Sequence, residues 1–441
     1  MRTANVRTQT VVKNIAASFV FKALGMLCSL IIVPVTMNYV NAEMYGIWMA
    51  MTSVMYFFMF SDAGLGNGMR NYLTEAVSMN DRNKARSYFS TATFVLMGVA
   101  AVLFLVTTPV VFALDMNKVF NTATLDSKSL SVILCIASGF TLLQFVTKNV
   151  NIAYISMQRY AVSDLINFLI SLCSLLVIWI LAKTTLGNLL YIVVTFTFMP
   201  ILIHVIASIS LFRSHPEFRL SLASVDVNLA KQIVKKGLGF FVIQITSCLL
   251  IFGSANLLMS HYCGPVQVTV YNVAYKLFSV LFIGYTIIVS PLWNAYTDAT
   301  VKDDYLWIKK TFNRSLLTWA GSVVAGLVLL ALSGWIYKEW IGDSVAVPLS
   351  VSAAVLGYIC MFNLNNCATA LINGLNMIYV QIITSVVLSV LYIIAVFCIK
   401  GEYGIVGISL AMIFAYMLMS AVHLLQCYLI INKKAKGIWI K

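Results

Sequence analysis

The chain has 441 residues, of which 61% are hydrophobic and only 10% are charged. Because a soluble protein carries about 25% charged residues, this composition excludes an ordinary water-soluble globular protein. The formal net charge of +14 would suit a nucleic-acid-binding protein, but the distribution of the charge along the chain indicates another cause.

Apolar stretches of about 20 residues recur from one end of the chain to the other, each long enough to cross a bilayer core of about 30 Å. The sequence therefore predicts an all-α polytopic membrane protein, without the ten-residue alternation that is typical of an outer-membrane barrel. Twelve membrane-spanning helices are expected, at 13–39, 44–66, 88–113, 127–153, 161–183, 187–212, 236–260, 268–297, 311–335, 349–373, 377–398 and 404–430.

Lysine and arginine are distributed unevenly between the two sets of connections that join these spans. The two termini and the connections after even-numbered spans hold 21 Lys and Arg residues, whereas the other connections hold 5 and the spans hold 3. Positive residues favour the cytoplasmic side of a membrane. We therefore expect both termini in the cytoplasm and no nucleic-acid partner.

A polar phrase occurs twice in this apolar sequence. Residues 71–76 read NYLTEA, and residues 294–299, which lie 223 positions later, read NAYTDA. The same offset pairs Asp81 with Asp304. A second echo, NxxxAxI, begins at Asn149 and again 217 positions later, at the end of the fourth and tenth expected spans.

A duplicated six-span unit accounts for both echoes, because six spans return the chain to the side on which it started. We expect two six-helix bundles related by a pseudo-twofold axis along the membrane normal, as found in transporters. The predicted domains are an N-terminal bundle at 1–212, a cytoplasmic linker at 213–235 and a C-terminal bundle at 236–441 that ends in a short basic tail.

The first copy of the phrase, with its flanks, reads FSDAGLGNGMRNYLTEA at 60–76. Further pieces are YVNAEMYGIW at 39–48, SPLWNAYTDA at 290–299 and ALINGLN at 370–376. Together they resemble the signature regions of bacterial polysaccharide flippases, the Wzx-type O-antigen transporters of the multidrug/oligosaccharidyl-lipid/polysaccharide superfamily. The resemblance covers essentially the whole chain in length and number of spans.

This resemblance implies a MATE-like fold with a central cavity lined mainly by spans 1, 2, 7 and 8, and a transporter without enzymatic activity. It implies a multi-pass protein of the bacterial inner membrane that moves undecaprenyl-pyrophosphate-linked oligosaccharide, an O-antigen or related repeat unit, from the cytoplasmic to the periplasmic leaflet by alternating access. Besides this substrate, the expected partners are membrane lipids and other membrane proteins of polysaccharide assembly.

Three lysines lie within expected spans, where an ionisable residue usually faces a cavity. Lys22 follows Lys13 by nine residues, or about 13 Å of helix, and Lys276 lies about 12 Å into its span, so we expect both near mid-depth. Lys148 lies near the cytoplasmic end of its span and either faces the cavity or reaches the interface. Cations at this depth suit a pyrophosphate-bearing substrate.

We expect polar side chains of the spans to form a hydrogen-bonding wall for sugar hydroxyls, with interhelical hydrogen bonds as the alternative for each. The candidates are Asn38, Gln244, Ser247, Asn256 and Asn272, and of these Gln244 and Asn256 are predicted to bind substrate. His204 and His423 are lone histidines in the last span of each half, and we expect them to be hydrogen-bonded packing residues and not metal ligands. No metal site, catalytic set or cofactor is expected.

The gate on the cytoplasmic side is expected to include four charged residues: Asp62, Arg70, Glu75 and Asp298. For Asp62 three interpretations stay open. It forms a salt bridge with Arg70 or Lys22, it locks the inward-facing gate, or it binds a coupling proton or sodium ion.

Two other functions compete with the flippase. A multidrug antiporter of the same superfamily exports organic cations and would prefer an acidic cavity, whereas the intramembrane excess here is basic. A membrane-embedded polysaccharide polymerase or ligase would need a large periplasmic loop to carry its chemistry, and the external connections here are short.

Overall fold

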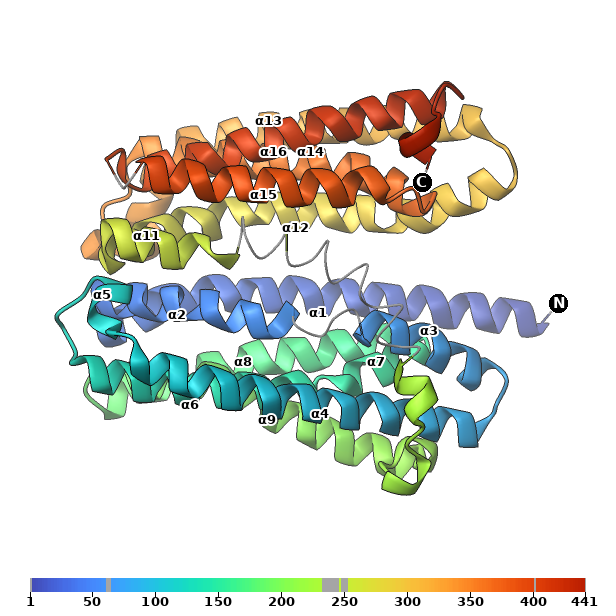
Figure 1. Cartoon of the computed structure of the whole chain (residues 1–441), viewed down its shortest axis with the longest axis horizontal. Helices are drawn as coiled ribbons and strands as arrows, with labels where there is room; N and C mark the ends of the chain where they lie inside the picture. Colours follow the sequence, from blue (N-terminus) through green and yellow to red (C-terminus); the bar gives the residue numbers. More distant parts are fainter. Residues whose placement is uncertain (1, 61–64, 232–245, 247–252, 400–401, 441) are drawn as a thin grey trace. The chain divides into compact units, whose positions relative to one another are not determined.

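The computed structural model describes residues 2–60, 65–231, 246, 253–399 and 402–440, and among these residues there are helices and connections but no β-strand. The chain divides into two compact units, residues 1–242 and 243–441 (Figure 1). The expected all-α class is confirmed.

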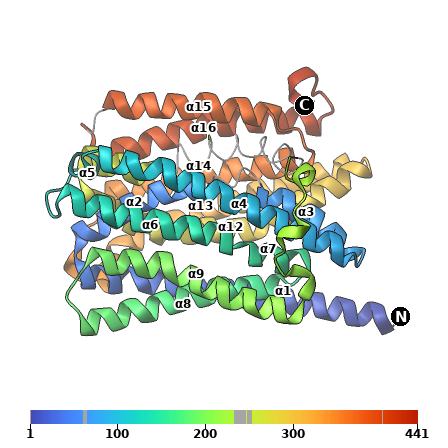
Figure 2. The same cartoon turned by 60° about the horizontal axis from the view of Figure 1, so that its bottom comes forward.

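Unit 1 contains nine α-helices and two short 3-10 helices in its described residues. They are α1 (Arg2–Val40), α2 (Ala42–Phe60), α3 (Leu65–Ser78), α4 (Arg82–Ala113), α5 (Met116–Phe120), α6 (Ser127–Thr147), α7 (Asn149–Ser156), α8 (Tyr160–Thr184), α9 (Leu189–Ser214), η1 (Pro216–Phe218) and η2 (Leu222–Ser224). Helix α1 packs along α8, while α6 packs against both α4 and α9 (Figure 2).

Unit 2 contains six α-helices in its described residues, and α14 is the central one. They are α11 (Ala255–Cys263), α12 (Pro265–Val301), α13 (Tyr305–Ile341), α14 (Leu349–Gly374), α15 (Tyr379–Ile399) and α16 (Gly404–Ile431), with 3-10 turns at η4 (Gly342–Ser344) and η5 (Gly437–Ile440). Helices α12, α13 and α16 all contact α14, and α15 packs on α16.

Ten helical segments in the described residues are long and apolar enough to cross a membrane: α1, α4, α6 with α7, α8, α9, α12, α13, α14, α15 and α16. They coincide with ten of the twelve expected spans. The expected span 44–66 corresponds to α2, whose first turn carries Glu43, and continues into residues 61–64, which lie outside the described residues. Most of the expected span 236–260 also lies outside them.

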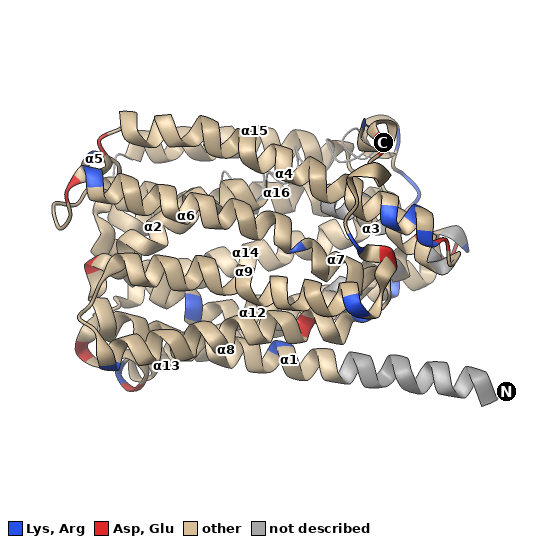
Figure 3. Ribbon diagram, turned by 90° about the horizontal axis from the view of Figure 1, so that it is seen from below, with Lys and Arg blue, Asp and Glu red and all other residues tan. Residues whose placement is uncertain are grey.

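The connections of unit 1 sort to its two ends as the charge distribution predicts. The turn at Asn80, Arg159 and His215 share the lining of one cavity, so these three connections meet at one end. At the other end, the Tyr39 hydroxyl hydrogen-bonds Thr185 at 2.8 Å and the Thr122 hydroxyl donates to Glu43 at 2.6 Å. Figure 3 shows most charged residues at helix ends and in connections.

The repeated phrase is followed by the same turn in both units. Asn80 and Asp303 have left-handed backbones, with φ of 56° and 55°. The next residue caps the following helix: Asp81 accepts from the Lys84 N–H and Asp304 from the Trp307 N–H, each at 3.0 Å. Such a cap satisfies one of the unpaired N–H groups at a helix start. The duplication inferred from sequence thus recurs as one local structure.

The phrase also supplies equivalent core residues to the two units. Ala76 and Phe89 lie in a buried cluster of unit 1, and Ala299 and Phe312, their counterparts at offset 223, lie in a buried cluster of unit 2. The second echo adds Ala153 to the first cluster and Ala370 to the second. The repeated segments therefore pack together within each unit. In unit 1 they lie on α3, α4 and α7, and in unit 2 on α12, α13 and α14.

In unit 2 the two signature segments at 290–299 and 370–376 touch each other. The Thr297 hydroxyl donates to the Gly374 carbonyl at 2.7 Å. A Cβ at position 374 would come within 2.8 Å of the Trp293 carbonyl and 2.9 Å of Tyr296. Only glycine allows α12 and α14 to approach this closely.

The segment after α9 folds back onto α4 instead of leaving unit 1. Arg86 donates to the Pro216 carbonyl at 3.0 Å, and Phe218 stacks edge-on against Phe89 with ring centroids 5.6 Å apart. Further along, the Ser221 N–H donates to the Ser90 hydroxyl at 3.1 Å. Much of the stretch that was predicted to be a cytoplasmic linker is thus a packed part of unit 1.

Candidate substrate-binding site

An ion pair joins α1 to α8 in unit 1. The Lys22 ammonium lies 3.6 Å from an Asp164 carboxylate oxygen, and the Ser18 hydroxyl donates to the same oxygen. The Lys22 side chain is 52% exposed and the Asp164 side chain 15%. The lysine therefore has a nearby counter-ion and still presents half of its surface outside the bundle of unit 1.

The register of α1 and α8 fixes the level of this pair. The two helices run parallel, because residues 146 positions apart meet both at Ser18 with Asp164 and at Tyr39 with Thr185. Asp164 is the fifth residue of α8, so it lies about 6 Å along the axis from the helix start. Lys22 consequently lies near that end of α8, and not midway along it as its distance from Lys13 suggested.

The predicted site residues included Asp62 but not Asp164. The signal was present, because Asp164 lies four residues inside α8 and an ionisable residue within a span is uncommon. Its partner, by contrast, is 142 positions away and follows only from the packing of α1 on α8.

Lys148 lies at a break between helices, after α6 ends and before α7 begins. Its ammonium is 3.5 Å from the Met59 carbonyl and 5.1 Å from the centroid of the Phe145 ring. Met59 is one of the last residues of α2, where carbonyl groups lack helical partners and the helix dipole favours a cation. Lys148 thus neutralises a helix end, which gives it a structural role alongside the predicted binding role.

In unit 2, Lys276 and Asn256 belong to one polar stretch of α11 and α12. The Asn272 amide donates to the Asn256 side-chain oxygen at 2.9 Å, so Asn256 takes part in an interhelical hydrogen bond. Lys276 is partly buried and follows Asn272 by four residues, which puts both on the same face of α12. This face combines a cation with amide groups, the chemistry expected of a surface for phosphate and sugar.

The structure tests little of the predicted gate. Glu75 is exposed on α3. Asp62 and Gln244 lie outside the described residues, and so do the side chains of Arg70 and Asp298, although their backbones belong to α3 and α12. Within unit 1 the described candidates are Lys22, Lys148 and Glu75, and within unit 2 they are Lys276 and Asn256.

The two histidines are buried packing residues, as predicted. His423 is fully buried and contacts the Asn365 side-chain oxygen at 2.8 Å and the Thr384 hydroxyl at 2.9 Å. His204 is 2% exposed and contacts the Asn151 amide at 3.3 Å. Nowhere in the described ranges do three His, Cys, Asp or Glu side chains group closely enough to hold a metal ion.

The chain matches a protein family over most of its N-terminal two thirds. The family model described as "Polysaccharide biosynthesis protein" matches residues 11–293. A candidate O-antigen transporter of Salmonella typhi is 20% identical over 354 residues, which cover 79% of this chain and 78% of that one. A second, from Salmonella typhimurium, is 21% identical over 192 residues, 42% of this chain and 44% of that one.

Solved structures show the same fold at low identity. A multidrug resistance MATE family transporter of the MOP superfamily in an inward-facing conformation is similar with a TM-score of 0.77 and 12% identity, covering 95% of this chain and 100% of that one. A MOP superfamily transporter from Pyrococcus furiosus, whose binding pocket is described as having reverse polarity, gives a TM-score of 0.62 at 12% identity, with 97% and 96% covered. The chain therefore belongs to the polysaccharide biosynthesis protein family and is a Wzx-type, multi-pass membrane transporter with the MATE-like fold of the MOP superfamily.

Proposed function

We propose that this transporter moves a lipid-pyrophosphate-linked oligosaccharide from the cytoplasmic to the periplasmic leaflet of the bacterial inner membrane, with both termini in the cytoplasm. The family and the Salmonella relatives support a polysaccharide precursor as the substrate. The observation that carries the proposal is the ion pair between Lys22 and Asp164. It keeps a cation within a span, and the cation can still exchange its carboxylate partner for an anionic substrate.

In the empty protein Asp164 neutralises Lys22, which lowers the cost of keeping the ammonium within the membrane. A pyrophosphate carries more negative charge than one carboxylate, so it competes for the ammonium when the substrate enters. Lysine acts as a point charge and imposes little geometry on its ligand. When the substrate leaves, Asp164 pairs with Lys22 again, which favours release.

Unit 2 contains a second set of groups with this chemistry, Lys276 and the amide groups beside it. Their chemistry suits phosphate and sugar hydroxyls respectively, and Asn272 already orients Asn256 by a hydrogen bond. Lys148 contributes mainly by stabilising the end of α2 in this account.

A multidrug antiporter is the second candidate, because a multidrug transporter shares the fold and Asp164 adds an acidic group within a span. Deletion of the gene distinguishes the two. The flippase account predicts that lipid-linked repeat units accumulate on the cytoplasmic face and that surface polysaccharide is lost. Unchanged polysaccharide together with increased sensitivity to organic cations would favour the antiporter.

A further inference from the structure

The repeated turn lines a cavity in each unit. In unit 1 a cavity of about 220 Å³ lies between Asn80, Arg82, Arg159, His215 and Glu217. In unit 2 a cavity of about 270 Å³ lies between Asp303, Tyr305, Met377, Lys433 and Ile440.

The two cavities occupy equivalent places in the repeat. Asn80 and Asp303 are the left-handed residues of the same turn, and Arg82 and Tyr305 begin the helices that follow. Arg159 in unit 1 and Met377 in unit 2 also occupy equivalent positions. The N–H of Arg159 donates to a carbonyl at the end of α7, and that of Met377 donates to a carbonyl near the end of α14, at 2.8 and 3.0 Å. The two cavities therefore share one backbone frame and differ in the side chains that line it.

In unit 2 the cation of the cavity is already neutralised. The Lys433 ammonium lies 3.1 Å from both carboxylate oxygens of Asp303 and 4.5 Å from the centroid of the Tyr305 ring. A carboxylate and an aromatic face together satisfy this ammonium. The unit 2 cavity thus needs no external anion.

In unit 1 the counterparts of these two partners are Asn80 and Arg82, so an acid is replaced by an amide and an aromatic ring by a cation. Arg82 and Arg159 are both exposed, and neither forms an ion pair within the described part of the chain.

Two carboxylates that line this cavity, Asp81 and Glu217, have partners of their own. Asp81 caps α4 and lies 3.5 Å from the Lys84 ammonium, and Glu217 lies 3.2 Å from His215 Nδ1. Backbone N–H donation from Lys84 holds the pKa of Asp81 below its usual range, so this carboxylate stays ionised and bound to its own helix. The two guanidinium groups, which form no ion pair among the described residues, share the cavity lining with these carboxylates.

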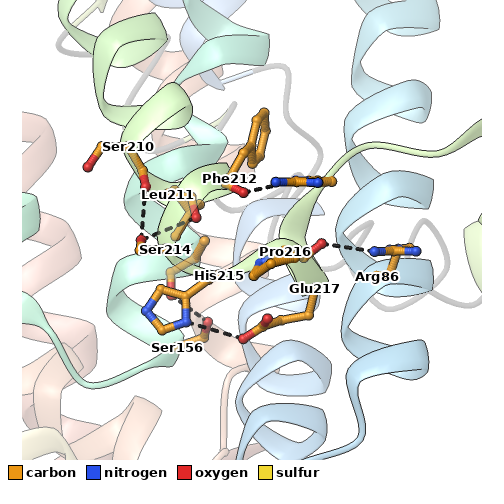
Figure 4. Close-up of polar contacts among 11 residues, drawn as sticks. Arg86, Ser156, Ser210, Leu211, Phe212, Ser214, His215, Pro216 and Glu217 are labelled. Atoms are coloured by element: carbon orange, nitrogen blue, oxygen red, sulfur yellow. Dashed lines mark hydrogen bonds and ion pairs between the residues drawn. The ribbon is translucent and has the colours of Figure 1, made fainter.

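The wall of the cavity is fixed before any ligand arrives. Figure 4 shows Arg86 directed at the Pro216 carbonyl and His215 facing Glu217. Phe218, which follows directly, is fully buried against α4. The side of the cavity formed by η1 is therefore held in place by contacts that do not involve Arg82 or Arg159.

We propose that the unit 1 cavity binds a phosphate group through Arg82 and Arg159. Guanidinium groups match phosphate oxygens in charge and geometry. The phosphate belongs either to the headgroup of an anionic phospholipid or to a soluble phosphorylated compound. The site is separate from the Lys22 site and does not depend on the transport proposal.

Binding is tested on purified full-length protein with two probes, inorganic phosphate in solution and phosphatidylglycerol retained in native mass spectrometry. The double variant Arg82→Gln/Arg159→Gln should weaken binding of at least one probe by about tenfold, as expected for loss of two charge-assisted contacts. Loss of phosphatidylglycerol binding identifies a lipid headgroup, and loss of phosphate binding alone identifies a soluble ligand. Thermal unfolding verifies that the variant is folded.

Lys433→Gln is the matched control, because it removes a cation from the equivalent cavity of unit 2. It should bind the affected probe as the parent does. The proposal is overturned if the parent binds neither probe, if the double arginine variant binds both normally, or if Lys433→Gln loses binding equally.

Discussion

His204 in α9 and His423 in α16 occupy corresponding helices of the two units, yet their hydrogen bonds differ. His423 uses both ring nitrogens, with partners on α14 and α15. His204 has a single contact of 3.3 Å, and its Nδ1 has no partner among the described residues, nor do the side-chain oxygens of Asn149 and Asn151. The same contrast holds for the two cavities that the repeated turn lines. In unit 2 Lys433 pairs with Asp303, whereas in unit 1 Arg82 and Arg159 form no ion pair among the described residues.

This difference teaches that the duplicated frame has been kept while its polar groups have diverged. In unit 2 His423 and Lys433 have partners within their own unit, which stabilises these two places. At the equivalent places of unit 1, His204, Arg82 and Arg159 retain unused binding capacity among the described residues. We infer that at these two places unit 1 keeps polar groups available for ligands, whereas unit 2 uses them for internal stability.

The histidines give the largest expected difference in stability. His423→Ala leaves Asn365 and Thr384 buried without their partner, which should cost about 2–4 kcal/mol of unfolding free energy, because each unsatisfied buried group costs about 1–3 kcal/mol. His204→Ala creates a cavity of the same size but breaks one long contact, so it should cost clearly less. Thermal unfolding of the two variants in the same detergent makes the comparison, and equal losses would contradict it.

The ion pair gives the next largest effect, measured as transport. Lys22→Gln leaves Asp164 facing the anionic substrate, so the additional change Asp164→Asn should restore part of the activity by removing that repulsion. We expect the double variant to transport about fivefold better than Lys22→Gln alone, within the coupling of about 0.5–3 kcal/mol that contacting residues show. Additive losses would show that the two side chains act independently.

Lys433 provides a smaller, contrasting effect in unit 2. Its ion pair with Asp303 is exposed, and exposed pairs contribute about 0–1 kcal/mol. Lys433→Gln should therefore lower stability slightly and leave surface polysaccharide unchanged in a complemented deletion strain. A strong transport defect would show that Lys433 contributes to transport and would contradict the contrast between the two cavities.

The smallest effect concerns the cap at the repeated turn. The Lys84 N–H lowers the pKa of Asp81 in the folded protein, so the cap stabilises above the unfolded pKa of about 3.9 and is lost as the pH falls through the lower folded value. Between about pH 5 and pH 3 the parent should lose slightly more thermal stability than Asp81→Asn, which keeps an acceptor but does not titrate. Identical pH profiles would show that the cap carries no pH-dependent stability.

The sequence predicted the frame of each unit because its signals are local. Apolar runs marked ten of the helical spans, and the recurrence of Asp81 as Asp304 marked the shared turn and cap. The two histidines were also placed correctly, since a lone buried imidazole usually needs a hydrogen-bond partner.

The site was predicted less well because its contacts join distant parts of the chain. No local pattern shows that Ser18 and Lys22 meet Asp164, or that the turn at Asn80 shares a cavity with Arg159 and residues after α9. Such pairings depend on helix packing, which a single sequence does not specify.

The most direct test of the account measures transport by the purified protein in lipid vesicles that contain a labelled lipid-pyrophosphate-linked oligosaccharide. The parent should move the label between leaflets, Lys22→Arg should retain part of this activity, and Lys22→Gln should lose about tenfold or more, since a substituted guanidinium keeps the charge and a neutral amide does not. Equal transport by the parent and Lys22→Gln, at equal incorporation into vesicles, would contradict a cationic substrate site in unit 1.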